Sequence, residues 1–200
     1  DRVTDYYLPT TFAGDFVTQA GSTAPVSGVV GLPVYAVFAY KWAGLDPQTG
    51  DPRGYLNGEV SKDYAEIIAS DRGIEDLQYF GSAIPTSFGS FINSFGYKQF
   101  SLDVGITYKF GYWFRRSSIN YSQRWQKPGD ELFTDVPSNT YTANSASDTF
   151  YSGSSVLVEK GDHIRLQYIN FGYQLTASQL RGFPLKSLNL YCSVSNLGIL

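Results

Sequence analysis

The chain has 200 residues, of which 15 are Lys or Arg and 18 are Asp or Glu, so its net charge is −3. This balance excludes a strongly basic nucleic-acid-binding surface as the default interpretation. Charged residues make up only 16% of the chain and aromatic residues another 16%, which favours strands whose surface faces something other than water. The single Cys excludes an intramolecular disulfide.

Residues 1–33 are small, polar and rich in Gly, Ser and Thr, so we expect an irregular lead-in. The next segment, 34–45, is β-branched and aromatic on both faces and is predicted to be the first strand. Residues 46–84 carry Asp-Pro turn signals. Within them we expect one short helix at 62–69, with Ser61 as its N-cap.

A second strand is predicted at 86–97, and a strict alternation of apolar and other residues follows it. The apolar even positions are Phe100, Leu102, Val104, Ile106, Tyr108, Phe110, Tyr112 and Phe114. A period of two predicts a strand with one apolar face. At ~3.3 Å per residue these residues would reach about 50 Å, whereas strands of globular proteins usually reach ~17–20 Å. We therefore interpret 99–114 as a strand that crosses a bilayer.

Two further strands are predicted at 163–176 and 187–199. The first of them changes its apolar phase near Tyr168, which predicts a β-bulge there. Short connections between strands alternate with long polar segments, as in outer-membrane barrels, whose long loops are extracellular and whose turns are periplasmic. The pattern predicts an all-β fold in which 34–200 contribute about five strands to a transmembrane antiparallel β-barrel.

The chain contains no recognisable catalytic constellation. His163 is the only histidine, and the Asp residues at 46–51 lack the full pattern of a Ca²⁺ loop. We therefore expect no enzymatic activity, no metal site and no cofactor.

Aromatic residues of the long polar loops are the candidates for ligand binding, because flat rings beside polar side chains suit a sugar or a peptide. The alternative is that these rings pack the loops against one another. The candidate residues are Trp125, Arg124, Tyr121, Tyr141 and Tyr151. Trp125 is the strongest of them, since cationic side chains flank it and Trp and Arg are frequent in binding hot spots.

Five segments of the chain resemble SusC/RagA-type TonB-dependent transporters, and they occur in the order of that family. They are AYKWAGLDPQTGDPRGYLNG (39–58), FGYKQFSLDVGITYKFGYWFRR (95–116), RWQKPGD (124–130), KGDHIRLQYINFGYQL (160–175) and VSNLGIL (194–200). The resemblance implies the carboxy-terminal part of a 22-stranded outer-membrane barrel with a plugged lumen. We expect the plug domain and the segment that contacts TonB to be absent from these residues.

The resemblance also implies partners and a location. Such transporters pair with a SusD-like lipoprotein, are driven by the TonB complex, and import glycans or, in some members, peptides. We therefore expect a place in the outer membrane of a Gram-negative cell, in contact with lipid and without a nucleic-acid partner. The alternatives are a soluble carbohydrate-binding β-sandwich, which the apolar face at 100–114 contradicts, and a small outer-membrane barrel of eight strands, which needs three more strands than we find.

Overall fold

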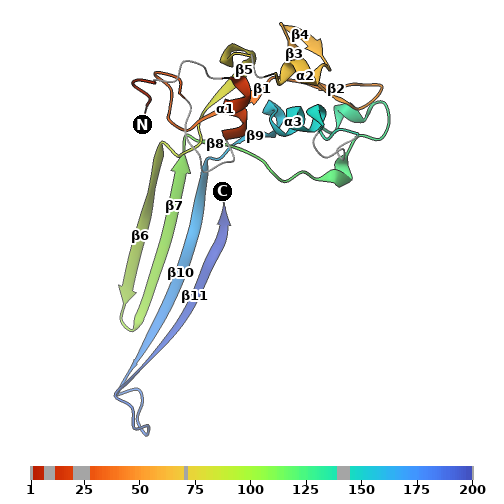
Figure 1. The fold of residues 1–200 in the computed structure, drawn as a ribbon. Helices are drawn as coiled ribbons and strands as arrows, with labels where there is room; N and C mark the ends of the chain where they lie inside the picture. Colours follow the sequence, from red (N-terminus) through yellow and green to blue (C-terminus); the bar gives the residue numbers. More distant parts are fainter. Residues whose placement is uncertain (1, 7–11, 20–27, 70–71, 139–144, 200) are drawn as a thin grey trace. The chain divides into compact units, whose positions relative to one another are not determined.

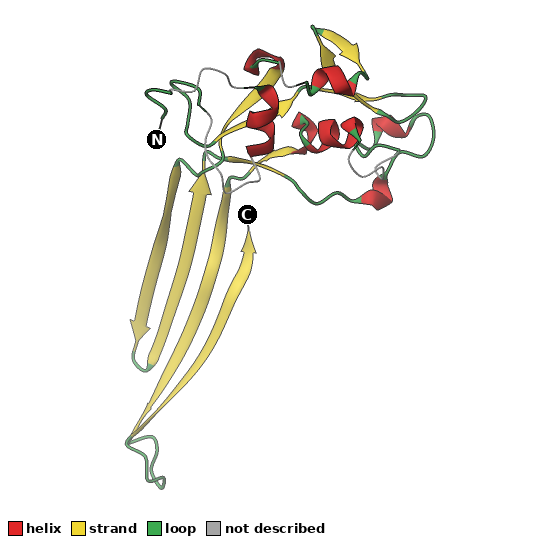
Figure 2. Cartoon of the chain, viewed as in Figure 1, coloured by secondary structure: helices red, strands yellow, loops and turns green. Residues whose placement is uncertain are grey.

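The computed structural model of the protein describes residues 2–6, 12–19, 28–69, 72–138 and 145–199. Strands predominate over short helices, in agreement with the expected all-β class (Figure 2). The backbone divides into two compact units. The first comprises the described residues within 1–84 and 112–160, and the second those within 85–111 and 161–200.

The second unit is a four-stranded antiparallel sheet with the strand order β11-β10-β7-β6 (Figure 1). Its strands are β6 (Ser87–Tyr97), β7 (Phe100–Phe110), β10 (His163–Thr176) and β11 (Ser187–Ile199). These bounds confirm the strands expected at 86–97, 163–176 and 187–199. The short β6–β7 and β10–β11 connections lie at the same end of the sheet. The two longer stretches of chain therefore join the sheet at its opposite end, as the alternation of short and long connections predicted.

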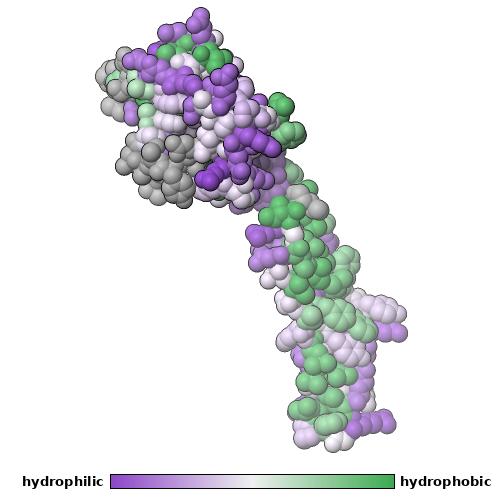
Figure 3. Space-filling model, turned by 90° about the vertical axis from the view of Figure 1, so that its right-hand side faces the viewer, coloured by the Kyte–Doolittle hydropathy of each residue, from purple (hydrophilic) through white to green (hydrophobic). Residues whose placement is uncertain are grey.

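The register gathers most of the apolar residues of the four strands on one face of this sheet. Residues that lie opposite each other in antiparallel strands share a face, and Ile106 of β7 lies opposite Phe91 of β6 and Leu166 of β10. This apolar face carries Phe91, Phe95, Tyr97, Phe100, Leu102, Val104, Ile106, Tyr108, Phe110, Ile164, Leu166, Ile169, Phe171, Tyr173, Leu175, Leu188, Leu190, Cys192 and Val194. Apolar side chains run along the length of the sheet in the space-filling view (Figure 3).

The other face, which we call the polar face, carries the intervening residues. Most of them are polar or glycine, and the larger apolar or aromatic ones are Phe88, Ile92, Tyr168, Tyr191 and Ile199. Asp103 lies opposite Asn170, and Thr107 lies opposite Arg165. The Oγ of Ser193 donates a hydrogen bond of 2.6 Å to Oδ1 of Asn170, which links β11 to β10 on this face. Asp103, Thr107 and Lys109 therefore lie on the face opposite to the even residues of β7.

A β-bulge between Leu166 and Tyr168 confirms the phase change expected in β10. Beyond the bulge Tyr168 lies opposite Gly105 of β7. A Cβ atom on Gly105 would come within 2.4 Å of the Tyr168 ring. The absence of a side chain at Gly105 thus allows the Tyr168 ring to lie directly against β7.

The single strand predicted at 99–114 is wrong, because the backbone breaks at Gly111. Gly111 has a φ of +74°, a conformation that glycine adopts most readily. Its N–H donates to Oδ1 of Asp162 at 2.6 Å. The chain resumes as β8 (Trp113–Arg115), which pairs with β9 (Val158–Lys160) and not with the long sheet. In the sequence, the alternation of apolar residues continues across this break to Tyr112 and Phe114, so it did not reveal where the strand ends.

The first unit consists of small sheets and short helices. Its remaining strands are β1 (Ala36–Tyr40), β2 (Trp42–Leu45), β3 (Pro52–Leu56), β4 (Glu59–Ser61) and β5 (Leu77–Ser82). Its α-helices are α1 (Ala13–Gln19), α2 (Tyr64–Ile67) and α3 (Ala146–Ser152), and its 3-10 helices cover Ile74–Asp76, Tyr121–Gln123, Asp130–Leu132 and Ser155–Leu157. The strands pair as β1-β5, β2-β3-β4 and β8-β9. Phe16, Phe38, Tyr40 and Phe150 form the centre of its hydrophobic core.

The segment predicted as the first barrel strand, 34–45, belongs to this core and not to the long sheet. It divides into β1 and β2, and β1 pairs with β5. Phe38 and Tyr40 are buried in one cluster, while Val37 and Ala39 are buried in another. Because both faces of β1 are apolar and buried, it lacks the polar side that a barrel strand turns to its lumen. The long sheet therefore has four strands where the sequence predicted five.

Two smaller expectations are also corrected. The lead-in is not wholly irregular, because it contains α1, and Phe16 and Val17 of this helix lie in the core. The helix expected at 62–69 is the shorter α2, and its N-cap is Asp63, whose carboxylate accepts a bond from Glu66 N–H at 3.3 Å. The Oγ of Ser61 instead accepts a bond from Asp63 N–H at 3.0 Å.

Candidate functional site

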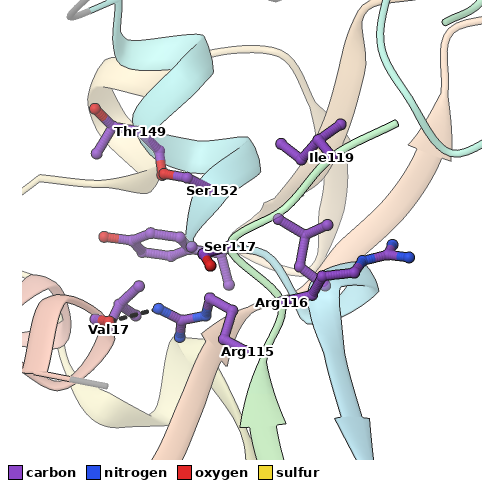
Figure 4. Close-up of a pocket in the computed structure, with 10 residues that line it drawn as sticks. Val17, Arg115, Arg116, Ser117, Ile119, Thr149 and Ser152 are labelled. Atoms are coloured by element: carbon purple, nitrogen blue, oxygen red, sulfur yellow. Dashed lines mark hydrogen bonds between the residues drawn. The ribbon is translucent and has the colours of Figure 1, made fainter. Parts of the chain in front are cut away.

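A pocket of about 380 Å³ opens in the first unit where α1, β1, β8 and α3 approach one another (Figure 4). Its lining residues are Val17, Tyr40, Arg115, Arg116, Ser117, Ile119, Thr149, Ser152, Gly153 and Leu157. The volume lies within the range of small-molecule sites, ~300–1,000 Å³. We call it the Arg115 pocket, since this side chain provides its buried charge.

Arg115 connects two elements of the core through its guanidinium. Its Nη1 donates to the carbonyl oxygen of Val17 at 2.6 Å (Figure 4). Its Nη2 donates to the carbonyl oxygen of Phe38. The buried Nε has no hydrogen-bond partner among the residues that the structure describes. Burial lowers the pKa of Arg115, and the nearby Tyr40 acts in the opposite direction. Since guanidinium groups stay protonated at neutral pH, the pocket holds a partly buried positive charge.

The other lining groups leave the pocket positive and partly apolar. Nη1 of Arg116 lies 3.3 Å from Oε1 of Glu159, which itself does not line the pocket. Burial raises the pKa of Tyr40, so this hydroxyl stays neutral and adds no negative charge. No Asp or Glu is among the lining residues. The Arg115 guanidinium and the apolar walls therefore favour an anionic ligand with an apolar part.

Trp125, the strongest ligand-binding candidate from the sequence, is buried and not open to a ligand. Only 7% of the residue is exposed. Its Nε1 donates to Oε2 of Glu131 at 3.1 Å, and this bond lowers the pKa of Glu131. Its ring lies against Gly50, where a Cβ atom would come within 2.4 Å of the indole. Trp125 thus fixes the 124–136 loop to the turn between β2 and β3.

The other four sequence candidates do not form one surface with it. Tyr151 is 4% exposed on α3, its ring centroid lies 5.8 Å from that of Trp42, and burial raises its pKa to about 12. Tyr121 is 42% exposed and Arg124 is exposed on the same segment. Tyr141 lies outside the described residues. Among the described candidates, only Tyr121 and Arg124 are accessible from solvent.

Sequence reasoning missed the most exposed apolar pair of the loop. Leu132 is 78% exposed and Phe133 is 89% exposed, and we call them the apolar tip. The loop below them is well braced, because Oδ2 of Asp130 accepts bonds from the N–H groups of Gln126 and Lys127, both at 3.0 Å. The adjacent Leu-Phe within a polar stretch was the signal available in the sequence.

The Asp residues at 46–51 form a turn held by a lysine. Nζ of Lys62 lies 2.9 Å from Oδ2 of Asp46 and 3.4 Å from Oδ2 of Asp51. The bond from Lys62 and the N–H of Gln48, 2.9 Å from Oδ1, lower the pKa of Asp46 to about 2. Within the described part of the chain, no cluster of three or more His, Cys, Asp and Glu residues could hold a metal ion. Nor is any described helix long and apolar enough to cross a membrane.

No protein-family model matches the sequence, and no curated protein matches it. Solved structures of the RagAB peptide transporter do match its fold. The RagAB peptide importer in the open-open state aligns with a TM-score of 0.56 and 19% identity, covering 98% of this chain and 20% of that chain. A second RagAB peptide transporter structure gives a TM-score of 0.59 and 18% identity, with coverages of 90% and 20%.

The RagAB importer in the closed-closed state gives a TM-score of 0.55 and 21% identity, covering 99% of this chain and 21% of that chain. The chain therefore spans about a fifth of the length of the chains it matches. The likeness agrees with the resemblance to SusC/RagA-type transporters found in the sequence. This chain has the fold of one part of the RagAB peptide transporter structures.

Proposed function

We propose that this chain is part of a SusC-like TonB-dependent transporter in the outer membrane of a Gram-negative cell. The observation that carries the proposal is the long sheet of β6, β7, β10 and β11, which has one largely apolar and one largely polar face. Phe91, Phe95 and Leu190 on the apolar face are 63%, 59% and 52% exposed. Water disfavours so continuous an apolar surface, whereas lipid matches it. The polar face then suits the lumen of a barrel.

The distribution of aromatic residues supports a membrane-spanning position of this sheet. On the apolar face Phe100 and Tyr173 lie near the hairpin end, with ring centroids 4.6 Å apart. Tyr108 and Phe110 lie near the other end, 5.4 Å apart. Phe100 and Phe110 are separated by about 33 Å along the strand, or about 25 Å across a bilayer at a tilt of ~40°. This separation matches the ~25 Å apolar band between two aromatic girdles.

The proposed cargo is a peptide or an oligosaccharide, and the proposed partner is a SusD-like lipoprotein. The names of the matched structures, which are peptide transporters, support the peptide. We assign the apolar tip, Leu132 and Phe133, to contact with the lipoprotein, and the exposed Tyr121 and Arg124 to contact with cargo. Trp125 contributes by holding their loop in place. In this proposal the plug and the TonB-contacting segment belong to other parts of the transporter.

Uptake by whole cells tests the proposal. Cells that produce the full-length transporter and its paired lipoprotein should accumulate labelled peptides or oligosaccharides, and should lose this uptake when either TonB or the transporter gene is deleted. Cell fractionation should place the transporter in the outer membrane. Unchanged uptake of both cargo classes in the deletion strains, or recovery in the soluble fraction, would contradict the proposal.

The partner contact is tested separately by Phe133→Ser in the full-length transporter. Co-purification with the lipoprotein should fall, while barrel assembly stays intact because Phe133 is 89% exposed. Val60→Ser is the matched control, since Val60 is 52% exposed on strand β4, outside this loop. Trp125→Ala should also weaken uptake or lipoprotein association by loosening the loop. Wild-type association in both loop variants would remove this loop from the proposed interface.

A further inference from the structure

The Arg115 pocket contains a positive charge that the described protein does not neutralise. Two of the donors of Arg115 are used on backbone carbonyls, which are neutral. None of the ion pairs among the described residues includes Arg115. A buried charge is costly unless an opposite charge or full hydrogen bonding compensates it. The uncompensated positive charge of Arg115 therefore favours the binding of an anion in this pocket.

The Arg115 guanidinium is the principal donor group for such an anion. Arg116 also lines the pocket, but its guanidinium is paired with Glu159 at 3.3 Å. The hydroxyls of Thr149 and Ser152 already donate to carbonyl oxygens of α3 and its N-cap, so they are not the principal donors to a ligand. Guanidinium groups bind carboxylates with paired, charge-assisted hydrogen bonds. The anion that best fits these donors is a planar carboxylate.

The rest of the pocket is suited to an apolar group beside that carboxylate. Val17, Ile119 and Leu157 contribute aliphatic walls, and the Tyr40 ring contributes an aromatic one. A strongly hydrated anion such as sulfate or free phosphate would leave these walls uncovered. From the Arg115 guanidinium, the apolar walls and the volume of about 380 Å³, we propose that the Arg115 pocket binds a carboxylate attached to an apolar group, as at the end of a peptide with an apolar last residue.

This inference goes beyond the proposed transport function and is tested by binding, not by uptake. The purified full-length transporter in lipid nanodiscs is titrated calorimetrically with acetyl-Ala-Leu and, separately, with acetyl-Ala-Leu-amide. The two probes differ only in the terminal carboxylate. We expect the acid to bind about tenfold or more tightly than the amide, since a charged hydrogen bond contributes at least that much. Octanoate as a competitor distinguishes a free apolar acid from a peptide end.

Two variants locate the binding. Ser152→Trp places a large side chain at an exposed position that lines the pocket, leaves Arg115 in place, and should abolish binding of the acid. Val60→Trp, on an exposed strand away from the pocket lining, should bind like the wild type.

Equal binding of acid and amide would overturn the proposal and leave Arg115 as a link between α1 and β1 only. Unchanged acid binding in a folded Ser152→Trp variant would also overturn it, because the carboxylate would then bind elsewhere in the transporter. Displacement of the acid by octanoate at similar concentrations would support the apolar carboxylate and extend the ligands to fatty acids. Failure of octanoate to compete would support a peptide end.

Discussion

Replacing Ile106 with arginine tests which face of the long sheet contacts lipid. Ile106 lies near the middle of β7, on the apolar face, between Phe91 of β6 and Leu166 of β10. If this face contacts lipid, Ile106→Arg brings a cation to about the bilayer midplane, which costs roughly 2–4 kcal/mol. The folding equilibrium in lipid should then fall by about 30- to 900-fold.

Thr107→Arg is the matched control, one residue further along the same strand and on the polar face. It places a cation opposite Arg165, and an unfavourable cross-strand pair costs no more than about 1 kcal/mol. Urea-induced unfolding of the full-length transporter from lipid vesicles measures both free energies. Equal losses for the two variants, or a larger loss for Thr107→Arg, would refute the assignment of the apolar face to lipid.

Three further predictions concern single sites. Gly105→Ala should lower the free energy of unfolding by about 1–3 kcal/mol, because its Cβ forces the Tyr168 ring away from β7; urea titration measures this. Asp46 has a lowered pKa, so its turn should be protected above pH ~4 and lose protection as the pH falls towards 2, which amide hydrogen exchange of the turn follows. Gly50→Ala should speed proteolysis of the 124–136 loop, because the new Cβ displaces the Trp125 ring.

Each of these predictions has a control in the same chain. Gly96→Ala meets no atom within 4 Å, so its free energy of unfolding should change by less than about 0.5 kcal/mol. Lys62→Met removes the main cause of the lowered pKa of Asp46, so protection should be lost nearer to the ordinary value of 3.8. Gly58→Ala shares the positive φ of Gly50 but meets no neighbour. Proteolysis as fast in Gly58→Ala as in Gly50→Ala would assign the effect to backbone strain alone.

Strands β7, β10 and β11 were predictable because their apolar side chains alternate with other residues, whereas β6 shows no clear period of two. β10 and β11 have the predicted bounds, and the phase change near Tyr168 correctly indicated a bulge. The strand at 34–45 was misplaced because high β-propensity does not reveal which sheet a strand joins. Its apolar character on both faces was the sign of a core strand.

The first unit was much harder to predict from the sequence. The Arg115 pocket combines residues as far apart as Val17 and Leu157, and no local pattern brings them together. Trp125 was correctly recognised as unusual, but its burial depends on Gly50, a residue far away in the sequence whose missing side chain provides the space. Loop aromatics therefore give little information about exposure until their tertiary neighbours are known.

The most direct test of the central claim is spin-label accessibility along β7 in the full-length transporter, reconstituted in lipid bilayers with Cys192 replaced by Ser. Labels are introduced one at a time at positions 101–107. If the apolar face contacts lipid, labels at 102, 104 and 106 will collide with dissolved oxygen and be shielded from a water-soluble nickel complex, while those at 101, 103 and 107 show the reverse. Equal access of the nickel complex to both sets would contradict the claim that this sheet is part of an outer-membrane barrel.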